Sequence, residues 1–301
     1  MSDKKEKQDF SWYYKFLIGI LRLLIYLPYP FLIKLGKGIG ILIYYFSKKA
    51  RAITFVNIQL CFPELSLAEQ KNLVIHNFES LGISLIEMIL AWWGKKEKLQ
   101  SLLQIQGMEY LEEAIAKGKG VILCSAHFMS LELVGRLLAN KLSFAVVYRP
   151  QKNAYMNKLA RECRERIYAK IISRGDLRGM LKYLKMNGIV WYTPDIDAGL
   201  QNSVFVPFFN IATATITATS RLIEHSQAEI LPTFLYRRAD GQGYDIIIHP
   251  PIENYPSGNI EEDAANVNKI IETAIRQAPE QYLWQYKRFK TRPNAEARFY
   301  D

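Results

Sequence analysis

The apolar positions of this chain form short continuous runs that alternate with longer segments of helical spacing. The runs are rich in Val, Ile and aromatic residues and predict strands at residues 121–126, 144–148, 189–193, 230–236 and 244–249. Segments between and around them predict helices over residues 66–93, 129–138, 155–170, 217–224 and 261–278. The first helix opens on a capping box, Ser66 and Glu69. This alternation predicts an α/β fold, a mixed sheet flanked by helices, with a helical region in front.

The N-terminal region is the most apolar part of the chain. Residues 16–46 carry only three charges and are interrupted by Pro28 and Pro30, so they lack the 18-residue apolar run of a straight transmembrane helix. The segment is too long for a signal peptide and has no small-residue cleavage site. Two apolar helices separated at the prolines, with basic residues on both flanks and aromatic residues at 12–14, are typical of a membrane anchor. The alternative is a core hairpin of a soluble domain.

A histidine and a glutamate follow the apolar strand at 121–126. His127 and Glu132 are five positions apart, which on one regular helix places the two side chains about 140° from each other. One of them must therefore lie outside a helix. We expect the strand to end near Ala126, His127 to occupy the turn, and a helix from about Met129 to carry Glu132 in its first turn. A base and its orienting carboxylate would then activate a hydroxyl; the alternative is a buried structural histidine and a solvated helix charge.

Composition and charge narrow the class of protein. Half of the 301 residues are apolar, enough for a sizeable core, and the net charge is +10. Cations outnumber carboxylates ten to three in residues 1–51, eleven to three in 149–185 and five to two in 287–301, leaving the remainder at −8. This distribution favours an anionic partner such as a phospholipid surface, a phosphorylated substrate or an acidic protein. Charge alone leaves nucleic acid possible.

Other reactive residues do not form a recognised site. Cys61, Cys124 and Cys163 stand far apart, which predicts a reducing compartment and no structural zinc. Asp195 and Asp197 lack a third oxygen ligand at a fixed spacing, so no metal site is expected, and Asp195 is expected to orient an acceptor or to pair with an arginine. There is no nucleotide-binding glycine pattern and no nucleophile elbow, so neither a cofactor nor a covalent acyl-enzyme is expected.

These residues carry a family resemblance. The sequence His127-Phe128-Met129-Ser130-Leu131-Glu132 resembles the H-x4-D/E motif of glycerolipid acyltransferases, specifically the late acyltransferases of lipid A biosynthesis, which include lauroyl and myristoyl transferases. Further landmarks of that family follow in order: Arg51, Asn57, residues 61–65, residues 148–150, Arg164, Arg166, residues 191–197, residues 203–209, residues 279–284 and residues 288–293. Two departures are Tyr286 and Lys287 in place of the usual His-Arg, and Thr193 where alanine is commoner.

The resemblance implies transfer of a fatty acyl chain from acyl carrier protein to a hydroxyl of a lipid A precursor, commonly one bearing Kdo sugars. It implies an acyltransferase at the cytoplasmic face of the bacterial inner membrane, with residues 1–50 as the membrane-anchoring region and 51–301 as the catalytic domain. The implied partners are acyl carrier protein, the precursor glycolipid and the membrane surface, without nucleic acid, metal or cofactor.

The resemblance also implies roles for individual residues. His127 would act as the base and Glu132 would orient it. Arg164, with Arg149 as a second candidate, would stabilise the developing oxyanion, and Asp195 would orient the acceptor or hold an arginine. The expected substrate contacts are Arg149, Arg166, Arg174 and Asp197. Two alternatives stay open: acylation of a lysophospholipid or another glycolipid, and a non-catalytic basic protein that binds membranes or nucleic acid.

Overall fold

The computed structural model describes residues 16, 18–293 and 296–300. Its centre is a seven-stranded sheet in the order β1-β9-β8-β2-β5-β3-β4. All neighbours are parallel except β8 and β9, which are antiparallel, so the predicted mixed α/β sheet is confirmed. The strands are β1 Leu103–Gln106, β2 Val121–Cys124, β3 Ala145–Tyr148, β4 Lys170–Ser173, β5 Ile189–Tyr192, β8 Glu229–Arg237 and β9 Tyr244–Ile248. A separate antiparallel hairpin pairs β6 (Ser203–Phe208) with β7 (Ile211–Ile216).

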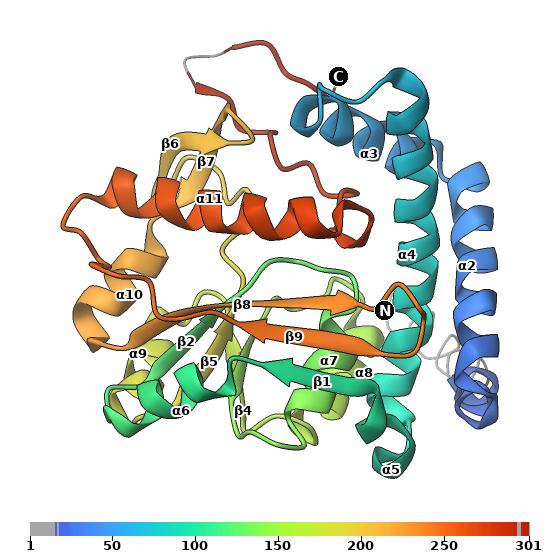
Figure 1. Ribbon diagram of the computed structural model, residues 1–301, viewed down its shortest axis with the longest axis horizontal. Helices are drawn as coiled ribbons and strands as arrows, with labels where there is room; N and C mark the ends of the chain where they lie inside the picture. Colours follow the sequence, from blue (N-terminus) through green and yellow to red (C-terminus); the bar gives the residue numbers. More distant parts are fainter. Residues whose placement is uncertain (1–15, 17, 294–295, 301) are drawn as a thin grey trace, which may run out of the picture.

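Helices cover both sides of the sheet. In Figure 1, α11 lies on one side beside the hairpin, and α6 lies on the other. The helices are α2 Tyr29–Phe46, α3 Lys48–Cys61, α4 Leu67–Trp93, α5 Lys96–Leu99, α6 Met108–Ala116, α7 Leu131–Leu138, α8 Ala154–Glu165, α9 Leu177–Lys185, α10 Ala218–Ser226 and α11 Ile260–Gln277, with short 3-10 turns at Leu24–Tyr26, Gln100–Leu102 and Pro279–Gln281. The chain at 16 and 18–23 is also helical.

Most predicted elements lie within about two residues of their expected bounds. The capping box is present, because Ser66 accepts from the backbone of Glu69 and the Glu69 carboxylate accepts from the backbone of Ser66. The helix expected over 155–170 is wrong at its end. It stops at Glu165, and Lys170–Ser173 forms β4 at the edge of the sheet beside β3. A four-residue edge strand with two apolar residues carries too weak a pattern to separate it from the helix before it.

The N-terminal region begins as two helical segments separated at the prolines, as predicted. The second, α2, packs side by side with α4 (Figure 1). Glycines allow this close approach, since a Cβ atom at Gly40 would lie 2.0 Å from the carbonyl oxygen of Phe78. A Cβ atom at Gly82 would lie 2.1 Å from the carbonyl oxygen of Gly36. The two backbones therefore touch, and any larger side chain at these positions would separate the helices.

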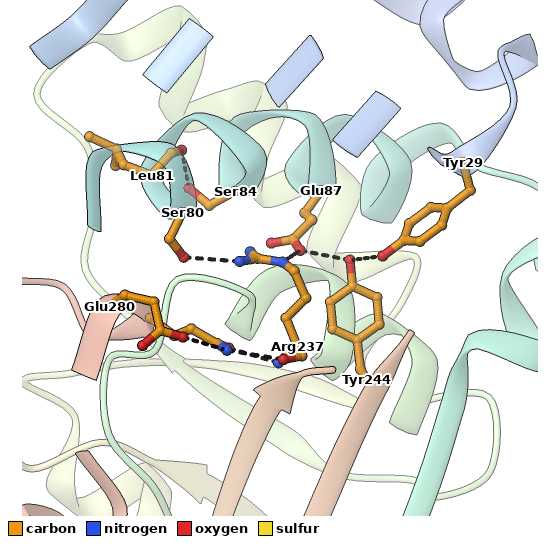
Figure 2. Close-up of polar contacts among 9 residues, drawn as sticks. Tyr29, Ser80, Leu81, Ser84, Glu87, Arg237, Tyr244 and Glu280 are labelled. Atoms are coloured by element: carbon orange, nitrogen blue, oxygen red, sulfur yellow. Dashed lines mark hydrogen bonds and ion pairs between the residues drawn. The ribbon is translucent and has the colours of Figure 1, made fainter. Parts of the chain in front are cut away.

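A buried polar network joins α2 and α4 to the sheet (Figure 2). The Arg237 guanidinium, at the end of β8, donates from Nε to Glu87 Oε1 (2.8 Å) and from Nη1 to Ser80 Oγ (2.9 Å). Tyr244 donates to the same Glu87 oxygen (2.6 Å), and Tyr29 donates to Tyr244 (2.8 Å). The start of α2 is thus connected through two hydroxyls to a buried ion pair.

Only one helix in the described part of the chain is long and apolar enough to cross a membrane. It is α4, and 56% of its apolar stretch is buried inside the protein, as expected of a core helix. The anchor expected at residues 1–50 is not identified by this criterion and stays a prediction. Its expected aromatic entry at 12–14 lies outside the described residues.

Candidate active site

The site lies where two central strands end. β2 and β5 are parallel neighbours with Cys124 opposite Tyr192, and the Ser125 amide donates to the Tyr192 carbonyl (2.9 Å). Every residue of both strands is buried. His127 and Asp195 each follow their strand by three residues, so the register of the two strands brings them together. The prediction that the histidine occupies the turn between a strand and a helix is confirmed, although β2 ends at Cys124 and α7 begins at Leu131.

Asp195 is the carboxylate that holds the histidine. His127 Nδ1 lies 2.6 Å from Asp195 Oδ1, while the His127 amide donates to Asp195 Oδ2 (2.9 Å). Tyr282 donates its hydroxyl to the same Oδ2 (2.9 Å). The Asp195 side chain has no exposed surface. With three donors around it, Asp195 has a fixed position, and the contact from its Oδ1 defines the orientation of the imidazole ring.

Burial and charge act against each other in this pair. Burial lowers the pKa of His127, but its attraction to Asp195 and their hydrogen bond outweigh burial, so the pKa is raised above its ordinary value of 6.5. Burial raises the pKa of Asp195, but the contacts with His127 and Tyr282 bring it below its ordinary value of 3.8. Asp195 is therefore a carboxylate at neutral pH, and His127 accepts a proton more readily than a free imidazole does.

The second ring nitrogen of His127 is available for chemistry. Nε2 lies 3.5 Å from the Thr193 hydroxyl, at the limit of a hydrogen bond, and one third of the side chain is exposed. When Nδ1 carries the proton shared with Asp195, Nε2 presents a lone pair. The histidine also lines a cavity of about 410 Å³. This geometry suits a general base facing a bound substrate.

The expectation that Glu132 orients His127 is wrong. Glu132 sits in the first turn of α7 as predicted, but its two oxygens accept from Arg164 Nε (3.0 Å) and Nη2 (2.6 Å). Trp92, at the end of α4, donates its indole N–H to Glu132 Oε1 (2.8 Å). A planar guanidinium matches both carboxylate oxygens at once, whereas Asp195 already occupies Nδ1 of the histidine. The two residues of the H-x4-E motif therefore belong to different pairs. His127 pairs with Asp195, and Glu132 pairs with Arg164.

A C-terminal segment fixes the turn that carries His127. The Leu283 amide donates to the His127 carbonyl (3.0 Å), and the Met129 amide donates to the Gln281 carbonyl (2.8 Å). Tyr282, which lies between these bonds, supplies the hydroxyl on Asp195. The sequence placed this segment among the family landmarks but gave Tyr282 no role. No local pattern reveals that role, because the contact joins positions 87 residues apart.

The cavity beside His127 includes two of the four predicted substrate contacts. Arg149 follows β3, Arg174 follows β4, and both line it, as does Arg221 of α10, which sequence reasoning missed. The full lining is His127, Val147, Tyr148, Arg149, Arg174, Gly175, Leu177, Tyr192, Thr193, Ile196, Ala198, Gln201, Asn202, Ile216, Thr217, Ala218 and Arg221. A lining that combines apolar side chains with a few polar ones is typical of a small-molecule site.

The other two predicted contacts have structural partners elsewhere. Arg166 donates to the Glu162 carbonyl (3.2 Å) and to Cys163 Sγ (3.1 Å) and does not line the cavity. Asp197 is buried and accepts from the amide (2.8 Å) and hydroxyl (2.9 Å) of Thr291. These contacts show Arg166 supporting the end of α8 and Asp197 fastening the C-terminal segment.

Comparison with known proteins gives whole-chain similarities. A family model described as bacterial lipid A biosynthesis acyltransferase matches residues 2–291. A lipid A biosynthesis lauroyltransferase of Escherichia coli (strain K12) is 40% identical over 277 residues, covering 92% of this chain and 90% of the relative. A lipid A biosynthesis palmitoleoyltransferase of the same strain is 39% identical over 290 residues, covering 96% and 94%. A lipid A biosynthesis acyltransferase of Haemophilus influenzae is 33% identical over 287 residues, covering 94% and 92%.

Proposed function

Because this chain belongs to the bacterial lipid A biosynthesis acyltransferase family, we propose that it transfers a fatty acyl chain from the thioester of acyl carrier protein to a hydroxyl of a Kdo-bearing lipid A precursor. Acyl transfer in lipid A biosynthesis is the activity of the family, whereas the carrier protein and the form of the precursor are parts of this proposal. The observation that carries the mechanism is the His127 ring, which is held by buried Asp195 at Nδ1 and lines the cavity.

The proposed reaction uses His127 as a general base. Nε2 takes the proton of the acceptor hydroxyl as the oxygen attacks the thioester carbonyl and forms the new C–O bond. The tetrahedral intermediate then breaks its C–S bond, and the imidazolium returns the proton to the leaving thiolate, giving ester and thiol. Asp195 stabilises the imidazolium while it exists, because the ion pair with the buried carboxylate favours the charged ring. No acyl-enzyme forms in this scheme.

Developing charge on the thioester oxygen needs a donor, and Arg164 is our candidate. Its Nε and Nη2 are bound to Glu132, which fixes the plane of the guanidinium and leaves its Nη1 group for the oxyanion. Trp92 donates to the same Glu132 oxygen that accepts from Arg164 Nε. In this proposal Glu132 is a positioning residue that acts through Arg164, rather than the orienter of His127.

We further propose that residues 1–50 attach the protein to the cytoplasmic face of the inner membrane. Large apolar side chains are exposed along the described part of this region, including Phe16 (64%), Leu23 (63%) and Phe46 (85%). An apolar patch of this kind suits a membrane surface. Lys48 and Lys49, directly after Phe46, would meet anionic headgroups. The exposed apolar side chains support attachment to the membrane.

The test is acyl transfer by purified full-length protein in mixed micelles, with acyl carrier protein thioester and a Kdo-bearing precursor. We expect His127→Ala to lower kcat/KM by roughly 10²- to 10⁴-fold, the contribution of a general base, without loss of membrane association. His225→Ala is the matched control, since the His225 side chain is 62% exposed and lies on α10. Near-normal transfer by His127→Ala contradicts the base assignment. If the wild type acylates lysophospholipid but not the Kdo-bearing precursor, the proposed identity of the acceptor is wrong.

A further inference from the structure

Three arginine side chains around the cavity have no partner in the described part of the chain. Arg149, Arg174 and Arg221 are exposed, and none donates a side-chain hydrogen bond or forms an ion pair with a described residue. By contrast, Arg164, which does not line the cavity, binds Glu132 through two nitrogens. The described residues that line the cavity include no aspartate or glutamate. A cleft with one sign of charge concentrates a ligand of the opposite sign.

These arginines reach the cavity from separate elements of the fold. Arg149 and Arg174 follow neighbouring strands, β3 and β4, and the Arg174 amide donates to the Tyr148 carbonyl (2.9 Å), which links the two strand ends. Arg221 comes from the first turns of α10. The position of that helix is fixed at Thr217, whose amide (3.0 Å) and hydroxyl (3.1 Å) both donate to the Asn202 carbonyl. The arginines that line the cavity therefore come from the ends of β3 and β4 and from α10, which are far apart in sequence.

We propose that Arg149, Arg174 and Arg221 bind a phosphomonoester on the sugar headgroup of the acceptor. This inference rests on the proposed function and adds to it the feature by which the acceptor is recognised. A phosphomonoester carries a charge of about −1.5 to −2 near neutral pH and offers three acceptor oxygens, so it matches several guanidinium groups better than a singly charged phosphodiester does. Gln201 and Asn202 line the same cavity and supply amides for sugar hydroxyls.

The experiment compares two acceptors that differ only in the phosphomonoester, one intact and one with that phosphate removed. For the wild type we expect kcat/KM to fall by at least about tenfold when the phosphate is removed, because charge-assisted hydrogen bonds are lost. For Arg221→Gln we expect a loss of roughly tenfold on the phosphorylated acceptor, mostly in KM, and little change on the other. Arg221→Lys keeps the positive charge but lacks the planar guanidinium with its several donors. It should therefore recover part of the lost kcat/KM.

The control is Arg178→Gln, which removes the same charge from an exposed arginine on α9 that does not line the cavity. It should leave both acceptors unaffected, and an equal thermal midpoint for Arg221→Gln and the wild type would show that the fold is intact. If Arg221→Gln loses activity equally on both acceptors with a higher KM for the thioester, the arginines bind the phosphodiester of the carrier and the inference is overturned. Equal kcat/KM of the wild type on the two acceptors also overturns the inference. If the wild type acylates neither acceptor, the proposed function itself is refuted.

Discussion

Two glutamate–arginine pairs contact the long helix α4, and their surroundings differ. In the first, Glu132 binds Arg164 and accepts from Trp92 of α4; the side chains of the glutamate and the arginine are 16% and 24% exposed. In the second, Glu87 of α4 binds Arg237, and the exposed fractions are 1% and 8%. The first pair adjoins the turn of His127, and the second lies in the interior, where it connects α2 to the sheet (Figure 2).

Their hydrogen bonds indicate different roles. Both oxygens of Glu132 accept hydrogen bonds from Arg164, and Nη1 of that guanidinium has no hydrogen-bond partner among the described residues. In the interior pair, Glu87 Oε2 and Arg237 Nη2 have no hydrogen-bond partner among the described residues, although both atoms are buried. A buried pair with incomplete hydrogen bonding gives little net stability, yet removing one partner leaves an uncompensated charge. The interior pair therefore connects elements of the fold, whereas the proposed role of the Glu132–Arg164 pair is in the reaction.

The largest effect should come from breaking the interior pair. Glu87→Ala is expected to lower the free energy of unfolding by about 3 to 5 kcal/mol, because the Arg237 charge stays buried without a partner. Urea unfolding of the detergent-solubilised protein measures this change. Glu64→Ala is the control, since the exposed pair of Glu64 with Arg276 should contribute no more than about 1 kcal/mol. Equal losses of unfolding free energy in Glu87→Ala and Glu64→Ala would show that burial does not make the interior pair more costly to break than the exposed one.

Breaking the pair at the site should affect catalysis more than folding. Glu132→Gln is expected to lower kcat/KM by roughly 10²-fold, because Arg164 loses the carboxylate that fixes its plane. The loss of unfolding free energy should be smaller than for Glu87→Ala. Kinetics of Glu132→Gln, Arg164→Gln and the double variant test the pair directly. If the two residues act as one unit, the double variant falls no further than the worse single variant, and strictly additive losses contradict the coupling.

The smallest effect is a displacement of the pH profile. Only the neutral imidazole accepts a proton, so kcat/KM should rise with pH through the raised pKa of His127, with a midpoint above 6.5. Asp195→Asn removes the attraction that raises this pKa, so the midpoint should move to lower pH while the maximum rate falls. A profile that is unchanged in Asp195→Asn would contradict the ion pair as its cause.

The His127–Asp195 pair should also make the stability of the fold depend on pH. As the pH rises through the pKa of His127, this contribution to stability should fall while activity rises. The His127 part is complete below pH 6.5 and is lost as the pH rises through the raised value in the folded protein. The Asp195 part is complete above pH 3.8 and is lost as the pH falls through its lowered value. The pair therefore stabilises the fold most between these limits, and activity should rise as the upper limit is passed.

The sequence alone determined the local structure and the turn in which His127 lies. Apolar runs, helical spacing and the capping box depend on neighbours within a few residues, and they located β2, β5, α4 and α11. The turn that exposes His127 followed from the angle between positions five residues apart on a helix. Ordered landmarks then identified the family, because several spaced motifs are far more specific than one.

Only the tertiary structure decided which charged groups meet. Asp195 replaced Glu132 as the partner of His127 because the register of β2 and β5 places their ends side by side. The contacts of Tyr282, Trp92 and Arg221 join segments that are distant in the chain, and nothing in their local sequence records those distances. Periodicity fixes which face of an element is buried, whereas strand order and register fix which residues share a site.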